Sequence, residues 1–139
     1  MDLVERAERK SRMLAITMGV MGVVVVVLLS ITMWTHVDGW RGFQAGLTAA
    51  ALFYLTPFVR WLLPNKNLAR LIDDERTQAH RGTSCTIGLV AAVVAAFATM
   101  AMTEGNTLLT ASDAARTIMS VGVAAALLSF AALELRAAR

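Results

Sequence analysis

Four apolar runs, each long enough to cross a membrane, constrain this chain more than any other feature of its sequence. They cover residues 13–35, 42–63, 83–103 and 111–135. The first and third contain no charged residue, the second is uncharged until Arg60, and the fourth is uncharged over residues 117–133. About 20 helical residues cross the hydrocarbon core, and open sheet edges cannot face lipid. The runs therefore predict an all-α integral membrane four-helix bundle, with residues 1–139 forming a single transmembrane domain.

The composition supports a membrane protein over a soluble one. Hydrophobic residues make up 57% of the 139 residues and charged residues 17%, with a mean hydropathy of +0.60. Soluble domains average about 45–50% apolar and about 25% charged residues, and a short soluble chain cannot bury so much apolar surface. The first run is too long for the apolar core of a cleaved signal peptide. We therefore expect it to be retained as a span.

The basic residues are distributed unevenly, which predicts an orientation. Only two of the 13 lie toward the other side: Arg41, between the first and second runs, and Arg116, in the first turns of the fourth run. The others lie in the two terminal tails or within residues 60–81. Basic residues in short loops stay cytoplasmic. We therefore expect both termini and residues 64–82 to be cytoplasmic, in a multi-pass protein of a bacterial inner (plasma) membrane. The net charge of +3 follows from this pattern and does not indicate nucleic-acid binding.

Residues 64–82, which we call the charged segment, interrupt the apolar sequence with four basic and three acidic side chains. Acidic residues contribute little to orientation and weaken attraction to anionic headgroups. Their presence favours a surface that docks a protein partner, although headgroup binding or a solvated, orienting hairpin are alternatives. The residues that we expect to dock a partner are Arg70, Asp74, Glu75, Arg76 and His80.

The motif Asp74-Glu75-Arg76, followed by Thr77 and Ala79, directly precedes the third run. In this motif and in its helix layout the chain resembles an uncharacterised group of small prokaryotic membrane proteins with four predicted helices and a D-E-R motif before the third. That group has no assigned activity, so the resemblance implies no catalytic residue. It does imply that the charged segment is the characteristic feature.

The sequence indicates neither a catalytic nor a metal site, and no cofactor. Asp73, Asp74 and Glu75 are adjacent, so on a helix they point about 100° apart and cannot converge on one ion. Ionisable residues, which mark ion and proton paths, are missing from the middle of every run. The single cysteine, Cys85, excludes a C-x-x-C pair. We therefore expect a non-enzymatic accessory or regulatory protein; the alternative is a small transporter or membrane enzyme acting on a lipophilic molecule.

Small residues recur at four-residue spacing within the runs. Because lipid offers no hydrophobic contrast, small faces that let backbones approach drive helix association in membranes. They predict packing within the bundle or between copies in a homo-oligomer. The predicted helix-packing residues are Gly42, Gly46, Gly88, Ala92, Ala96 and Gly122.

The predicted orientation can be tested with reporter fusions. Fusions after Gly82 and at Arg139 should report the cytoplasm, because the basic residues gather on that side. Fusions at Gly39 and Asn106 should report the opposite side. An external signal at Gly82 would overturn the assignment.

Overall fold

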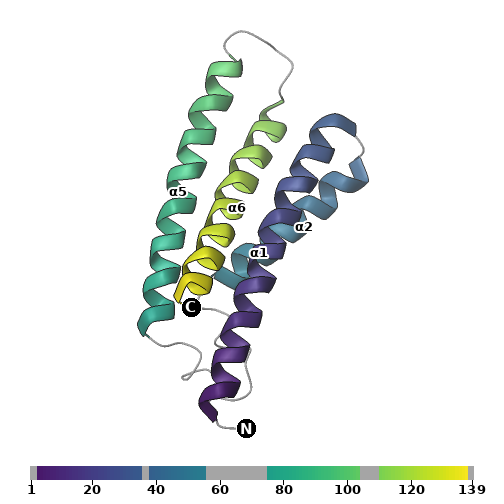
Figure 1. Cartoon of the computed structure of the whole chain (residues 1–139). Coiled ribbons are helices and arrows are strands. Elements are labelled where there is room, and N and C mark those ends of the chain that lie inside the picture. The colour runs from purple at the N-terminus through teal and green to yellow at the C-terminus, as the bar shows by residue number, and fades with distance from the viewer. Residues whose placement is uncertain (1–2, 36–37, 56–74, 104–109, 138–139) are drawn as a thin grey trace.

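The computed structural model of the chain describes residues 3–35, 38–55, 75–103 and 110–137. These residues form four helices and no strand (Figure 1): α1 Leu3–Thr35, α2 Asp38–Leu55, α5 Glu75–Thr103 and α6 Ala111–Ala137. Three of the helices are long and apolar enough to cross a membrane, over Arg12–Met33, Thr77–Met102 and Ala111–Ala137. The predictions of an all-helical chain and of membrane-spanning helices are thereby confirmed at this level.

Three helices begin earlier than the apolar runs, and α2 does so by one turn, at Asp38. α1 starts at Leu3, so the charged N-terminal tail forms the first turns of that helix. α5 starts at Glu75 and therefore includes the second half of the charged segment. Glu, Arg and Gln are good helix formers, and extending an existing helix costs little compared with starting one. α2 is described only to Leu55, so the rest of the predicted second run lies outside the described residues.

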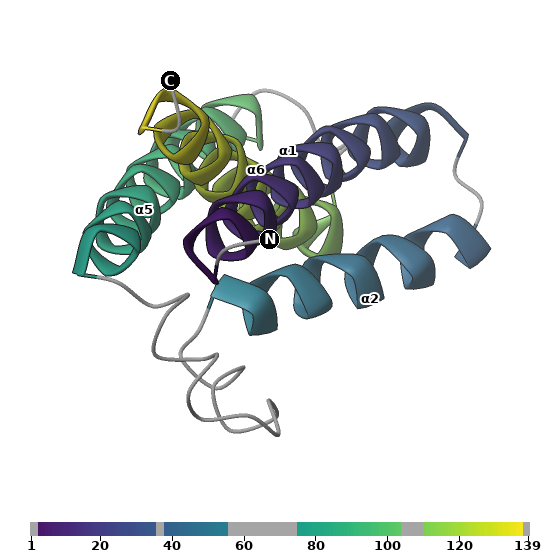
Figure 2. The same cartoon turned by 60° about the horizontal axis from the view of Figure 1, so that its bottom comes forward.

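α6 is the central helix of the bundle. α1 and α5 run in one direction and α2 and α6 in the other, so that α1 begins and α6 ends at the same end, which we call the termini end (Figure 1). α6 contacts α5, α1 and α2, and seen nearly end-on it lies between α5 and α1 (Figure 2). Half of its apolar span is buried, 50% against 28% for α1 and 11% for α5.

The apolar core lies where α1, α2 and α6 meet. Its residues are Met18 from α1, Ala51 from α2, and Val123, Ala126, Leu127 and Phe130 from α6. Phe130 and Leu127 are the largest apolar side chains that are fully buried. α6 thus supplies most of the core, in agreement with its central position.

α5 and α6 approach each other at their small residues. A Cβ built on Gly88 would lie 2.7 Å from the carbonyl oxygen of Gly122 and 2.7 Å from the Cβ of Ala126. A Cβ on Gly122 would lie 2.9 Å from the Cβ of Ala92. Real Cβ atoms do not come so close, so only glycine fits at these two positions. The structure therefore brings together three of the predicted packing residues, Gly88, Ala92 and Gly122, while Ala96 is half-buried farther along α5.

The other predicted stripe, Gly42 and Gly46 on α2, lies apart from the packing between the described helices. Both residues are exposed, and a Cβ on either meets no described neighbour within 4 Å. The buried face of α2 is instead formed by Gln44, Thr48 and Ala51. Residues two positions apart on a helix point about 160° apart, so burying Gln44 turns both glycines outward. Neither glycine therefore contacts a described neighbour, and their role in packing within the bundle or between copies stays a prediction.

Replacing Gly88 with Leu should separate α5 from α6, because even the first added carbon collides with backbone. Overpacking typically costs about 1–3 kcal/mol, and we expect at least that loss. Gly46→Leu is the matched control and should melt like the parent. Thermal unfolding in detergent measures both. Equal melting of parent and Gly88→Leu would contradict the described contact.

Candidate functional site

A polar cluster at the termini end connects the charged segment to α6. His80 Nδ1 lies 2.8 Å from Glu134 Oε2, and Thr77 Oγ1 donates a hydrogen bond of 3.4 Å to Glu134 Oε1. The side chains of His80 and Glu134 are only 19% and 10% exposed. An ionised Glu134 carboxylate can only accept, so with that carboxylate ionised the proton of the His80–Glu134 bond is on Nδ1. The cluster is a largely buried ion pair or charge-assisted hydrogen bond between α5 and α6.

The cluster is positioned by the same face of α5 that carries the glycine contact. Thr77, His80, Ser84 and Gly88 follow one another at spacings of three and four residues, so they share one side of the helix. Thr77, Ser84 and Gly88 are buried. Ser84 Oγ donates a hydrogen bond of 2.7 Å to the carbonyl oxygen of His80, which satisfies its buried hydroxyl group. The close approach at Gly88 thereby brings His80 within reach of Glu134.

Sequence reasoning did not single out Glu134, because it follows the uncharged part of the fourth run. The spacing of Glu134 from apolar residues of the same helix does indicate that its side chain is buried. Leu127, Phe130, Ala131 and Glu134 recur at three- and four-residue spacing, and all four are buried. An acidic residue in register with the apolar face of a helix requires a partner, because removing a lone charge from water costs several kcal/mol.

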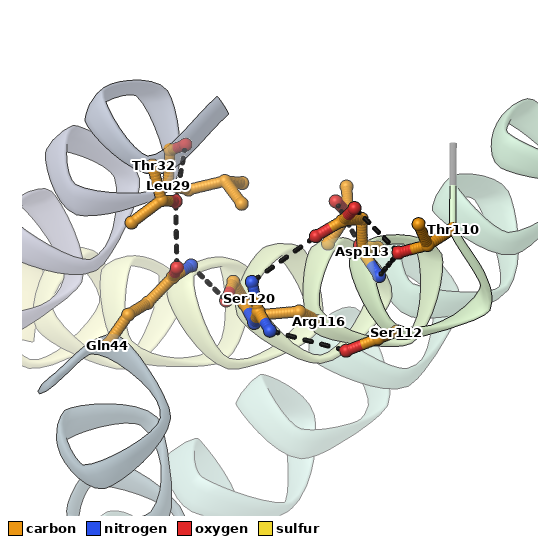
Figure 3. Close-up of polar contacts among 9 residues, drawn as sticks. Leu29, Thr32, Gln44, Thr110, Ser112, Asp113, Arg116 and Ser120 are labelled. Atoms are coloured by element: carbon orange, nitrogen blue, oxygen red, sulfur yellow. Dashed lines mark hydrogen bonds and ion pairs between the residues drawn. The ribbon is translucent and has the colours of Figure 1, made fainter. Parts of the chain in front are cut away.

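A second polar group joins three helices nearer the other end of the bundle (Figure 3). Gln44 of α2 is fully buried; its Oε1 accepts a hydrogen bond of 2.9 Å from Thr32 of α1, and its Nε2 donates one of 2.9 Å to Ser120 of α6. Thr32 also bonds the carbonyl oxygen of Leu29 at 3.0 Å. Gln44 is uncharged, so the pattern of ionisable residues along the runs does not single it out. A lone Gln in an apolar run is the signal that marks it.

The start of α6 is capped one turn before the charged residues of that helix (Figure 3). The backbone N–H of Asp113 donates to both the hydroxyl and the carbonyl oxygen of Thr110, at 3.2 and 3.0 Å. Thr110 is therefore the N-cap of α6. Arg116 bonds Asp113 and Ser112, each at 3.3 Å. Asp113 and Arg116 thus form a local pair on the surface of α6.

Within the described part of the chain, every buried polar side chain has a partner in the same chain. The set comprises Thr32, Gln44, Thr48, Thr77, Ser84, Thr99, Ser120 and Glu134. A search of the described residues for three or more His, Cys, Asp or Glu able to hold a metal ion found no such group. The polar groups of the described interior therefore bind one another.

The predicted docking residues fall in different places. His80 faces α6 and is engaged by Glu134, which makes it an anchor of the charged segment. Glu75 and Arg76 lie in the first turn of α5, and their side chains are outside the described part. Arg70 and Asp74 lie outside the described residues altogether.

Comparison with known proteins adds no further information on this site. No protein-family model matches the sequence, and no curated protein or solved structure matches it. Its interpretation rests on the residues themselves.

A double-mutant cycle tests the pairing of His80 with Glu134. His80→Leu removes the imidazole partner of the Glu134 carboxylate, and we expect it to lower stability by about 1–3 kcal/mol. Adding Glu134→Leu should recover much of that loss, because replacing both partners of a buried pair by apolar groups is often neutral. Unfolding in detergent measures the coupling. Strictly additive effects of the two substitutions would contradict the pairing.

Proposed function

We propose that this protein is a non-enzymatic accessory or regulatory component of a bacterial inner membrane, with both termini cytoplasmic, and that its charged segment docks a protein partner. The observation that carries this proposal is that the buried polar groups of the described residues bind one another. An enzyme or a transporter requires polar groups that point toward a ligand. The polar interior found here favours a scaffold that presents its function at its surface.

The connection between α5 and α6 supports a role for the charged segment. Its second half, from Glu75, is helical, and His80 ties that helix to Glu134. A docking surface held in place loses less conformational entropy on binding than a free one. The pair thus gives the charged segment a fixed base.

Residues with both signs of charge suit protein docking. Complementary charges set specificity and association rate more than affinity. Asp74, Glu75 and Arg76 supply both signs at adjacent positions, and Arg70 precedes Asp74 by four residues in the sequence. Arg76 is the residue on which we base the proposal most, because its planar guanidinium can bind a partner carboxylate through two parallel bonds.

The resemblance drawn from the sequence makes the D-E-R motif before the third helix part of this proposal. Thr77, which follows Asp74-Glu75-Arg76, contacts Glu134, so the residues after the motif join α5 to α6. In the group that the chain resembles, we infer that the D-E-R motif marks the corresponding junction. Membership in that group remains part of this proposal.

The docking role predicts that the combined variant Asp74→Ala, Glu75→Ala and Arg76→Ala loses its partner while it inserts and melts like the parent. Capture from native membranes in mild detergent, with quantification of copurifying proteins, measures the loss. Gln78→Ala, an exposed position on the next turn of α5, is the matched control and should retain the partner.

Three other outcomes would contradict the docking role. Failure to insert or early melting of the triple variant would make these charges structural. Unchanged capture would make the segment a solvated hairpin. A copurifying lipophilic compound with no stoichiometric protein would instead support a small transporter or membrane enzyme.

A further inference from the structure

One face of α1 carries two arginines followed by a stripe of apolar side chains. Arg9 and Arg12 are exposed, and the large apolar residues that follow on the same face are Ile16, Val20, Val23 and Val27, which are 50%, 57%, 53% and 49% exposed. At about 100° per residue these six positions fall within a sector of about 80°. They form a single strip along the helix, which we call the α1 outer face.

The α1 outer face is turned away from the rest of the bundle. The opposite side of α1 contains Ala15, Met18 and Val25, all buried, and Gly22, whose added Cβ would lie 3.0 Å from Leu128 of α6. Packing against α6 therefore leaves the α1 outer face to the surroundings of the protein.

The charges of Arg9 and Arg12 are not neutralised within the described part of the chain, where neither makes an ion pair or a hydrogen bond. Arg136, a third exposed arginine at the termini end, likewise makes none there. Glu134, at the same end, is already engaged by His80. In contrast, Arg116 near the opposite end is paired with Asp113. Arg9, Arg12 and Arg136, whose charges no described residue neutralises, therefore all lie at the termini end.

The depth of these residues matches the layers of a bilayer. The apolar span of α1 is Arg12–Met33. In a bilayer crossed by that span, Arg12 would lie at the edge of the hydrocarbon core and Arg9 about 4.5 Å beyond it. Ile16, Val20 and Val23 follow within about 17 Å of Arg12, close to the ~15 Å thickness of one leaflet. The arginines therefore lie at the level of the headgroups and the stripe at the level of the acyl chains.

We propose that the α1 outer face is a binding site for an acidic phospholipid. The phosphate is held by the guanidinium groups of Arg9 and Arg12 through charge-assisted hydrogen bonds, and an acyl chain lies along Ile16, Val20 and Val23. A zwitterionic lipid fits the same stripe, but its amine offsets the phosphate charge. The site therefore selects for a net negative headgroup. This inference requires a membrane-inserted bundle but no docking partner, so it stands apart from the function proposed above.

The test uses the purified full chain in phosphatidylcholine vesicles containing spin-labelled phosphatidylglycerol or spin-labelled phosphatidylcholine. Electron spin resonance gives the ratio of the two association constants. We expect the parent to prefer phosphatidylglycerol about fivefold, the effect of one arginine near an anionic surface, and the preference to weaken in high salt. Arg9→Gln with Arg12→Gln should bring the ratio close to one, and Arg9→Lys with Arg12→Lys should restore it.

Two further variants sharpen the test. Arg116→Gln removes a paired arginine from the other end of α6 and should leave the ratio unchanged. Glu5 and Glu8 precede Arg9 and Arg12 by four residues, the spacing at which opposite charges attract on a helix. Glu5→Gln with Glu8→Gln should therefore raise the ratio.

An equal affinity of the parent for both lipids would overturn the proposal, as would a loss of preference in Arg116→Gln as large as that in the double variant. Equal affinity accompanied by a stable dimer in sedimentation would instead assign the α1 outer face to a second copy of the chain.

Discussion

The close approach of α5 and α6 at Gly88 and Gly122 is the contact on which the rest of the bundle depends. α5 packs chiefly against α6, and the glycines let the two backbones approach within direct contact. Lipid provides no hydrophobic drive for helix association, so close packing has to supply it. The same approach brings His80 within 2.8 Å of Glu134. Without it, α5 would lose both its packing and its polar partner.

Two polar ties flank the apolar core and fix how the helices are rotated. Gln44 joins α2 to Thr32 and Ser120 near one end, and Glu134 joins α6 to His80 and Thr77 at the other. In a membrane, a rotation that exposed either side chain would leave polar atoms unpaired in hydrocarbon, at a cost of several kcal/mol. Interhelical hydrogen bonds in membranes add only about 0.6 kcal/mol on average. We therefore infer that the ties contribute more to specificity than to stability.

Hydropathy predicted the helical class and the membrane-length helices, because the number of apolar residues limits where a helix can cross lipid. The small-residue pattern includes Gly88, Ala92 and Gly122, which lie where α5 meets α6. It did not distinguish these residues from Gly42 and Gly46, because spacing shows that a face is small but not which way it points. The burial of Gln44 determines which face of α2 packs inward. Neither Gln44 nor Glu134 stands out in a search for charge in the middle of a run, because Gln44 is uncharged and Glu134 lies near the end of its run. Helices α1, α2 and α5 begin earlier than the apolar runs that predicted them. Charged residues end an apolar run, but they can continue a helix.

The central claim is that α6 lies between α1 and α5, and disulfide cross-linking in native membranes tests it most directly. On a Cys85→Ser background, Gly19→Cys with Ala131→Cys places Cβ atoms 3.3 Å apart across α1 and α6, close to the ~3.5–4.5 Å of a disulfide. His80→Cys with Glu134→Cys replaces two side chains whose polar atoms lie 2.8 Å apart across α5 and α6, a separation that a short bismaleimide linker spans. We expect mild oxidation to close the first pair and the linker to join the second, each within one chain. We expect no closure of Gly46→Cys with Ala131→Cys, because Gly46 meets no described neighbour within 4 Å. Failure of the first two pairs, or closure of the third, would contradict the central position of α6.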